Sequence, residues 1–118
     1  MAAASISRLV VSVSALKPAL TFYEGLLGLR LARAADELAW LTTGDGVEVM
    51  LHERAALPSD TAVALGFLVP DLDGTVDAWT ARGGALVDPP EERPWGERMA
   101  VVRDPDGHLV CLSQAAPA

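Results

Sequence analysis

The chain consists of two similar halves. A strand-like stretch, a helix with one apolar stripe and a glycine at the helix end occur twice, 56 positions apart, so that Tyr23 matches Trp79 and Gly28 matches Gly84. Later in each half the spacing becomes 61, and Leu51 matches Leu112. The second half therefore carries about five additional residues, which we place within 88–97. A repeat of this length indicates that each half is one supersecondary unit, which restricts the fold more than any single motif does.

Hydropathy patterns predict the order βαβββ in each half. In the first half we expect a helix over 18–27 and strands over 6–13, 29–34, 38–42 and 47–53. In the second half we expect a helix over 72–82 and strands over 62–69, 85–88, 98–103 and 108–114. A polar linker at 55–61 joins the two. The sequence thus predicts an α+β fold of two tandem βαβββ modules in a single domain over residues 1–118, with module one at about 5–54 and module two at about 61–115.

Composition limits the possible partners. A hydrophobic share of 51% in 118 residues is typical of a globular protein, and no apolar stretch is long enough for a membrane helix. The net charge of −7 disfavours nucleic acid, and it fits either solubility alone or a negative groove that attracts a cationic ligand. The single cysteine, Cys111, excludes an intramolecular disulfide framework and a multi-cysteine zinc site. We expect a cytoplasmic protein without a membrane or nucleic-acid partner.

Two groups of motifs carry a family resemblance. The first is Phe22-Tyr23 followed by Leu26-Leu27-Gly28-Leu29, and the second is Pro94-Trp95-Gly96 with Asp104-Pro105-Asp106-Gly107-His108. With the internal repeat, they make the chain similar to the vicinal oxygen chelate superfamily, which includes glyoxalase I, bleomycin-resistance proteins and extradiol dioxygenases. The resemblance implies curved mixed sheets that enclose a cavity, with modules pairing within one chain or between two. Many members are dimers, and we expect a homodimer.

The resemblance also implies four inward-pointing metal ligands, mostly His and Glu, on the first and fourth strands of each module. Counted from the motifs, the matching positions are Arg8, Met50, Ala64 and Cys111. None of these is His, Asp or Glu, and a shift of two residues that recruits Glu48 or His52 still leaves too few ligands. We therefore expect no metal and no other cofactor.

The candidate ligand-binding residues follow from the same alignment. Arg8 interrupts an apolar strand, and it serves either as an anchor for a ligand oxygen, braced by Glu48, or as half of an ion pair that only fills the metal position. His52 shares a strand face with Met50 and Glu48, and it lies either in the cavity or at its rim.

Aromatic and sulfur-containing residues complete the candidate set. Trp40 and Trp95 are predicted to flank the cavity, whereas Trp79 belongs to the helix stripe and the core. The alternatives for Met50, Met99 and Cys111 are soft, adaptable lining and ordinary sheet packing. Flat aromatic walls suit a large, planar or cationic natural product.

These features favour a metal-independent small-molecule binding protein, similar to the antibiotic-sequestering branch of the superfamily. Such a protein confers resistance by drug binding rather than by catalysis. The alternative is a metal-dependent lyase, isomerase or dioxygenase of the glyoxalase type. A regulatory module with a closed, fully packed interior is a third possibility.

Overall fold

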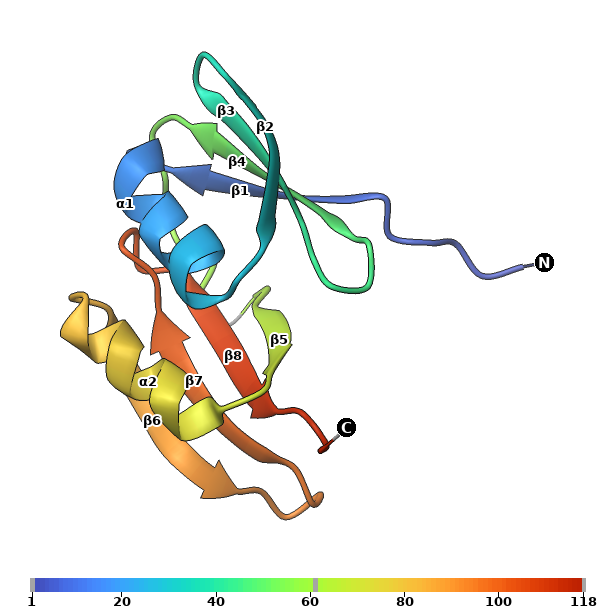
Figure 1. The fold of residues 1–118 in the computed structure, drawn as a ribbon, viewed down its shortest axis with the longest axis vertical. Coiled ribbons are helices and arrows are strands. Elements are labelled where there is room, and N and C mark those ends of the chain that lie inside the picture. Colours follow the sequence, from blue (N-terminus) through green and yellow to red (C-terminus); the bar gives the residue numbers. More distant parts are fainter. Residues whose placement is uncertain (1, 61, 118) are drawn as a thin grey trace. The chain divides into compact units, whose positions relative to one another are not determined.

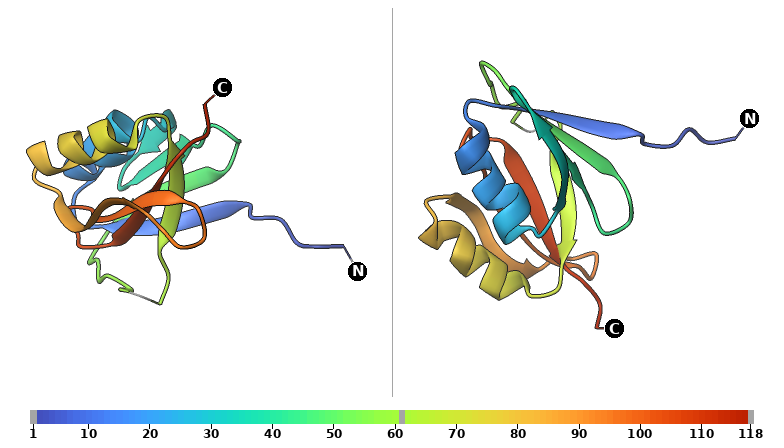
Figure 2. Two further views of the ribbon diagram at one scale, coloured as in Figure 1. Left: turned by 90° about the horizontal axis from the view of Figure 1, so that it is seen from below. Right: turned by 45° about the horizontal axis from the view of Figure 1, so that its top comes forward.

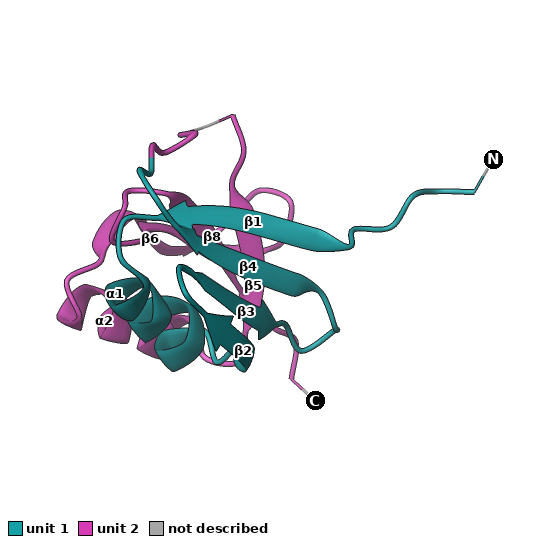
Figure 3. Ribbon diagram, turned by 90° about the horizontal axis from the view of Figure 1, so that it is seen from above, with its two compact units in different colours: residues 1–56 teal, residues 57–118 magenta. Residues whose placement is uncertain are grey.

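The computed structural model describes residues 2–60 and 62–117, and it divides into two compact units at residues 1–56 and 57–118 (Figure 3). Each unit has its own four-stranded sheet and its own helical segment (Figure 1). The expected module boundary at 61 and the expected domain limits at 1 and 118 lie outside the described residues. None of the helices in the described part of the chain has the length and apolarity needed to cross a membrane.

The first unit has the predicted βαβββ order. Its sheet has the strand order β1-β4-β3-β2, in which β1 and β4 are parallel and the other neighbours are antiparallel. A short α-helix and a π-helix separate β1 from β2. The elements are β1 (Arg8–Val13), α1 (Leu16–Leu20), η1 (Thr21–Leu26), β2 (Arg30–Ala35), β3 (Leu38–Thr42) and β4 (Glu48–Glu53).

The second unit repeats this arrangement. Its sheet has the order β5-β8-β7-β6, again with a parallel first pair and antiparallel neighbours. The elements are β5 (Leu65–Val69), α2 (Leu72–Ala81), β6 (Ala85–Glu92), β7 (Arg98–Arg103) and β8 (Leu109–Gln114). The strands of both sheets twist without closing into a barrel (Figure 2). The α+β fold of two tandem βαβββ modules is thus confirmed.

Alternate residues of the strands form the core of each module. In the first, Val49 and Leu51 are fully buried beside the helical residues Phe22 and Tyr23. In the second, Leu112 and Val102 are fully buried with Trp79, whose indole N–H donates to the Arg103 carbonyl at 2.8 Å. The predicted core position of Trp79 is therefore confirmed. The other face of each sheet is not covered by the helices of its own unit, and we call it the helix-free face.

The start of each helix is held from the end of the last strand. The Glu53 carboxylate accepts a hydrogen bond from the Leu16 backbone N–H at 2.8 Å. In the second module the Gln114 amide oxygen accepts from the Leu72 N–H at 2.9 Å. Both bonds satisfy a backbone donor that the helix itself leaves unpaired, so both modules use the same solution with different residue types.

The end of the first helix departs from the sequence prediction. The expected helix over 18–27 is split into α1 and the π-helix η1, in which the Leu27 N–H bonds to the Phe22 carbonyl at 2.9 Å. A π-turn takes up one extra residue. Consequently Gly28, with φ +72°, corresponds to Gly83, with φ +90°, rather than to Gly84.

The additional residues of the second module lengthen a hairpin. Strand β6 continues to Glu92, beyond the predicted end at Asp88, and a turn over 93–97 follows. The first module has only residues 36–37 between β2 and β3. The acidic residues Glu91 and Glu92 therefore lie in a strand, beyond the end of the strand predicted over 85–88.

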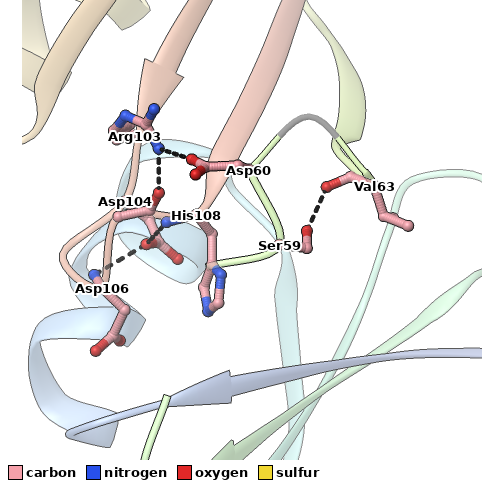
Figure 4. Close-up of polar contacts among 8 residues, drawn as sticks. Ser59, Asp60, Val63, Arg103, Asp104, Asp106 and His108 are labelled. Carbon is pink, nitrogen blue, oxygen red and sulfur yellow. Dashed lines mark hydrogen bonds and ion pairs between the residues drawn. The ribbon is translucent and has the colours of Figure 1, made fainter. Parts of the chain in front are cut away.

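The turns before β4 and β8 have matching hydrogen bonds. Thr43 Oγ1 accepts from the Val47 N–H at 2.9 Å, and Asp104 Oδ1 accepts from the His108 N–H at the same distance. Asp104 is buried, and the same oxygen also accepts from the Asp106 N–H (Figure 4). Arg103 connects this turn to the linker through an ion pair with Asp60 at 3.1 Å.

Candidate functional site

The helix-free face of the first sheet brings together five of the predicted site residues. Strand pairing aligns Arg8 with Glu48 in one row, Met50 with Trp40 in the next, and His52 with Leu38 and Ser12 in the third. Because side chains alternate along a strand, these positions all point to one side. The face of Trp40, ambiguous in the sequence, is thereby the face of Met50 and Glu48.

Arg33 joins the middle row from β2. A register shift between Leu31 and Arg33 places Arg33 directly opposite Trp40. The guanidinium carbon lies 3.9 Å from the centroid of the Trp40 ring, which is a cation–π contact. The row therefore ends in a flat, positively charged stack.

Arg33 was not predicted as a site residue. Strict alternation along β2, counted from Arg30, would place the Arg33 side chain on the face that the helix covers. The bulge reverses this assignment, because one unpaired residue moves the following side chains to the other side. No signal in the residue types alone marks that bulge.

Arg8 forms an ion pair with Glu48 through its Nε. Both alternatives for Arg8, a ligand anchor and an ion pair that only fills the metal position, include this contact, so the choice between them stays a prediction. A place inside an apolar strand would bury this guanidinium, but Arg8 is the first residue of β1 and its side chain is 48% exposed. An exposed pair of this kind adds little stability.

The helix-free face of the second sheet holds Cys111 and Met99. Cys111 lies opposite Gly66 and Val101, and Met99 lies opposite Ser113 and Glu91. Burial raises the pKa of the Cys111 thiol, and the negative charge of Glu97 raises it further, while Arg93 acts in the opposite direction. The thiol is therefore poorly suited to act as a nucleophile at neutral pH.

Trp95 lies in the turn between β6 and β7, apart from the strand positions. Its side chain is 67% exposed, and its indole N–H donates to Glu97 Oε1 at 3.0 Å. This bond and a second one with Ser113 hold the pKa of the Glu97 carboxyl below its ordinary value. Trp95 and Trp40 belong to different units, and their joint role in one site remains a prediction.

Arg93, the first residue after β6, forms ion pairs with carboxylates of that strand. Arg93 pairs with Glu91 at 3.0 Å and approaches Asp88 at 3.7 Å. Its Nε is buried without a hydrogen-bond partner in residues 2–60 and 62–117. Two carboxylates of the helix-free face of the second sheet, Asp88 and Glu91, are therefore paired with Arg93.

Comparison with known proteins defines the class. The model of the Glyoxalase/Bleomycin resistance protein/Dioxygenase superfamily matches residues 5–112, and the chain belongs to this superfamily. The resemblance seen in the sequence motifs is thereby confirmed. No curated protein matches the chain.

Solved structures agree with the fold. A glyoxalase-related enzyme from Fulvimarina pelagi superposes with a TM-score of 0.80 at 19% identity, covering 94% of this chain and 88% of that one. TioX from Micromonospora sp. ML1 gives 0.68 at 24% identity, with coverage of 96% and 100%. A virulence protein from Salmonella typhimurium gives 0.71 at 27% identity, with coverage of 98% and 100%.

The donor set does not fit the divalent metal that the superfamily implies. At the positions that the sequence motifs assign to metal ligands, the first module has a guanidinium, Arg8, and a thioether, Met50. The second has Ala64, which precedes β5, and the thiol Cys111. A permanent cation repels a metal ion, and a thioether is a poor ligand for hard cations. Within the described residues, no group of three or more His, Cys, Asp and Glu side chains is arranged to hold a metal ion.

Proposed function

We propose that this protein binds a small molecule without a metal and sequesters an antibiotic or another bulky natural product. The observation that carries the proposal is the Arg8–Glu48 ion pair at the first-strand metal position. Glu48, on the neighbouring strand, pairs with the Nε of Arg8, so this position can offer hydrogen bonds and charge to a ligand but no electron pair to a metal ion. Binding and not Lewis-acid chemistry is what such a pair can supply.

The surroundings of this pair support binding. Met50 and Trp40 lie in the adjacent row, and they provide an adaptable thioether and a flat aromatic surface. Ligand sites combine such apolar area with a few placed polar groups, here Arg8, Glu48 and His52. Superfamily membership supports the same reading, because the family description includes bleomycin-resistance proteins.

The proposal includes a homodimer in the cytoplasm, with no nucleic-acid or membrane partner. Each four-stranded sheet ends in unpaired edge strands, which a second copy can cover. The charge of −7 works against phosphate backbones.

The test is titration of metal-stripped protein with a panel of glycopeptide and quinone natural products, followed by tryptophan fluorescence. We expect saturable quenching with one ligand per chain, and recovery of the unchanged compound after denaturation. Free N-acetyltryptophanamide controls for optical absorption by the ligands. The variant Trp79→Phe retains Trp40 and Trp95 and should still respond.

Two results would contradict the proposal. One is a flat response across the panel. The other is turnover that appears when Fe, Zn, Ni or Mn is restored at one ion per chain, which would establish the alternative, a metal-dependent enzyme of the glyoxalase type.

A further inference from the structure

We infer that the ligand recognised by the helix-free face of the first sheet is a planar aromatic molecule bearing an anionic oxygen group, and that Arg33, stacked on Trp40, binds it together with Arg8. The inference rests on the proposed binding function and specifies the chemical class of the ligand. It departs from the cationic ligand that the acidic composition and the aromatic residues favoured.

The electrostatics of this face decide the sign of the ligand's charge. Strand pairing places Arg8, Arg30 and Arg33 on the face, against the single carboxylate of Glu48. Among the described residues, no carboxylate lies within ion-pair distance of Arg30 or Arg33. The face is therefore positive in a chain whose net charge is −7. A cationic ligand is repelled there, and it gains little from Trp40 because Arg33 already occupies the ring as its cation.

Arginine geometry decides the chemistry of the anion. A guanidinium is planar, stacks on an aromatic ring and still presents N–H donors at its edge. With Trp40 on one side of Arg33, the other side and the edge are left for a second flat group and its oxygen atoms. Carboxylates and phenolates match this donor edge and form short, charge-assisted hydrogen bonds.

The spacing of the rows sets the size of the ligand. Trp40 is two strands away from β1, with Met50 between them in the same row, and Arg8 lies one row along. With strands about 5 Å apart and about 7 Å between same-face neighbours, Trp40 and Arg8 are roughly 12 Å apart at the backbone. A fused-ring ligand spans this distance across Met50, with oxygen groups at Arg33 and Arg8.

Within the described residues, the second module has no matching stack. At the corresponding register positions, Asp88 lies opposite Val101, which pairs with Cys111. A carboxylate and an aliphatic side chain cannot reproduce a guanidinium on an indole. We therefore expect one binding site of this kind per chain, at the stack of Arg33 on Trp40.

The experiment compares three probes that share one ring system: anthracenecarboxylate, anthracenemethanol and anthracenemethylammonium. Calorimetric titration of the full chain is expected to show the carboxylate binding at least about tenfold more tightly than the ammonium, with the alcohol between them. High salt should weaken the carboxylate and not the alcohol.

Arginine variants test whether Arg33 is responsible for the preference for the carboxylate probe. Arg33→Gln should lower carboxylate affinity about tenfold, and Arg33→Lys should restore only part of it, because lysine keeps the charge but loses the plane. Arg82→Gln, an exposed arginine at the end of α2, removes the same charge elsewhere and should change affinity little. Circular dichroism of each variant confirms that it is folded.

The outcomes separate this inference from the function on which it rests. Equal binding of ammonium and carboxylate, equal effects of Arg33→Gln and Arg82→Gln, or no binding of any probe would overturn the inference, whereas the natural-product titration could still support sequestration. Conversely, an Arg33-dependent preference for the carboxylate together with catalytic turnover would support the inference and contradict sequestration.

Discussion

The two modules share a backbone and differ in the chemistry of their helix-free faces. In the middle row, Arg33, Trp40 and Met50 of the first module correspond to Asp88, Val101 and Cys111 of the second. Both sheets have a register shift at the same place, just before Arg33 and just before Asp88. The bulge is thus common to both modules, while the residue that it presents has opposite charge.

The residues that hold the backbone behave differently. Glu53 and Gln114 both accept from the first helix N–H, and Thr43 and Asp104 both accept from the last turn N–H. Residue type changes at these positions, but the hydrogen-bond acceptor remains. Backbone donors thus restrict a position to residues with a hydrogen-bond acceptor, whereas a strand face without covering helices restricts its side chains less.

The largest effect should come from the matched core leucines. Leu51→Ala and Leu112→Ala each remove a fully buried side chain, and each should lower the free energy of unfolding by about 2–5 kcal/mol because a cavity remains. Urea unfolding followed by circular dichroism measures this loss. Leu57→Ala, at a residue 88% exposed, is the control and should change stability by no more than about 0.5 kcal/mol. A negligible cost at only one of the two leucines would show that the cores are not equivalent.

A smaller effect should distinguish the matched turns. Asp104→Ala leaves two backbone N–H groups without their acceptor in a buried turn, and it should cost about 1–3 kcal/mol. Thr43→Ala leaves one such donor, and it should cost about 1 kcal/mol. Thermal and urea unfolding measure both values. Asp104→Asn keeps an acceptor oxygen and should recover part of the loss; equal costs for both alanine variants would refute the proposed ranking.

The smallest effect concerns the reactivity of Cys111. Because burial and Glu97 raise the thiol pKa, its thiolate fraction near pH 8 is below that of an exposed cysteine, and alkylation by iodoacetamide should be slow. Glu97→Gln removes the negative charge that disfavours the thiolate. The pKa should fall, and the pH–rate profile should shift to lower pH. Glu24→Gln, an exposed glutamate in the first unit, should leave the profile unchanged.

Periodicity and the repeat were sufficient to predict both modules and the core role of Trp79. Two predictions from periodicity were wrong. The first helix was expected to be a regular α-helix, but a π-turn accommodates one extra residue at its end. The strand expected over 85–88 continues to Glu92, although its last residues are acidic or proline. Propensity describes single residues, whereas strand pairing with β7 is a property of two segments. The exposure of Arg8 was missed for a similar reason. The predicted strand began at residue 6 and so placed Arg8 inside it, whereas β1 begins at Arg8.

The sequence by itself determined the α+β class and the duplicated βαβββ order, because both follow from side-chain chemistry and period. That Arg8, Met50, Ala64 and Cys111 occupy metal-ligand positions is what the family resemblance implies. Only the tertiary structure decided that Arg33 stacks on Trp40 and that the face around them is positive. The physical reason is the bulge in β2: side chains alternate strictly along a strand, and one unpaired residue reverses every assignment that alternation makes beyond it.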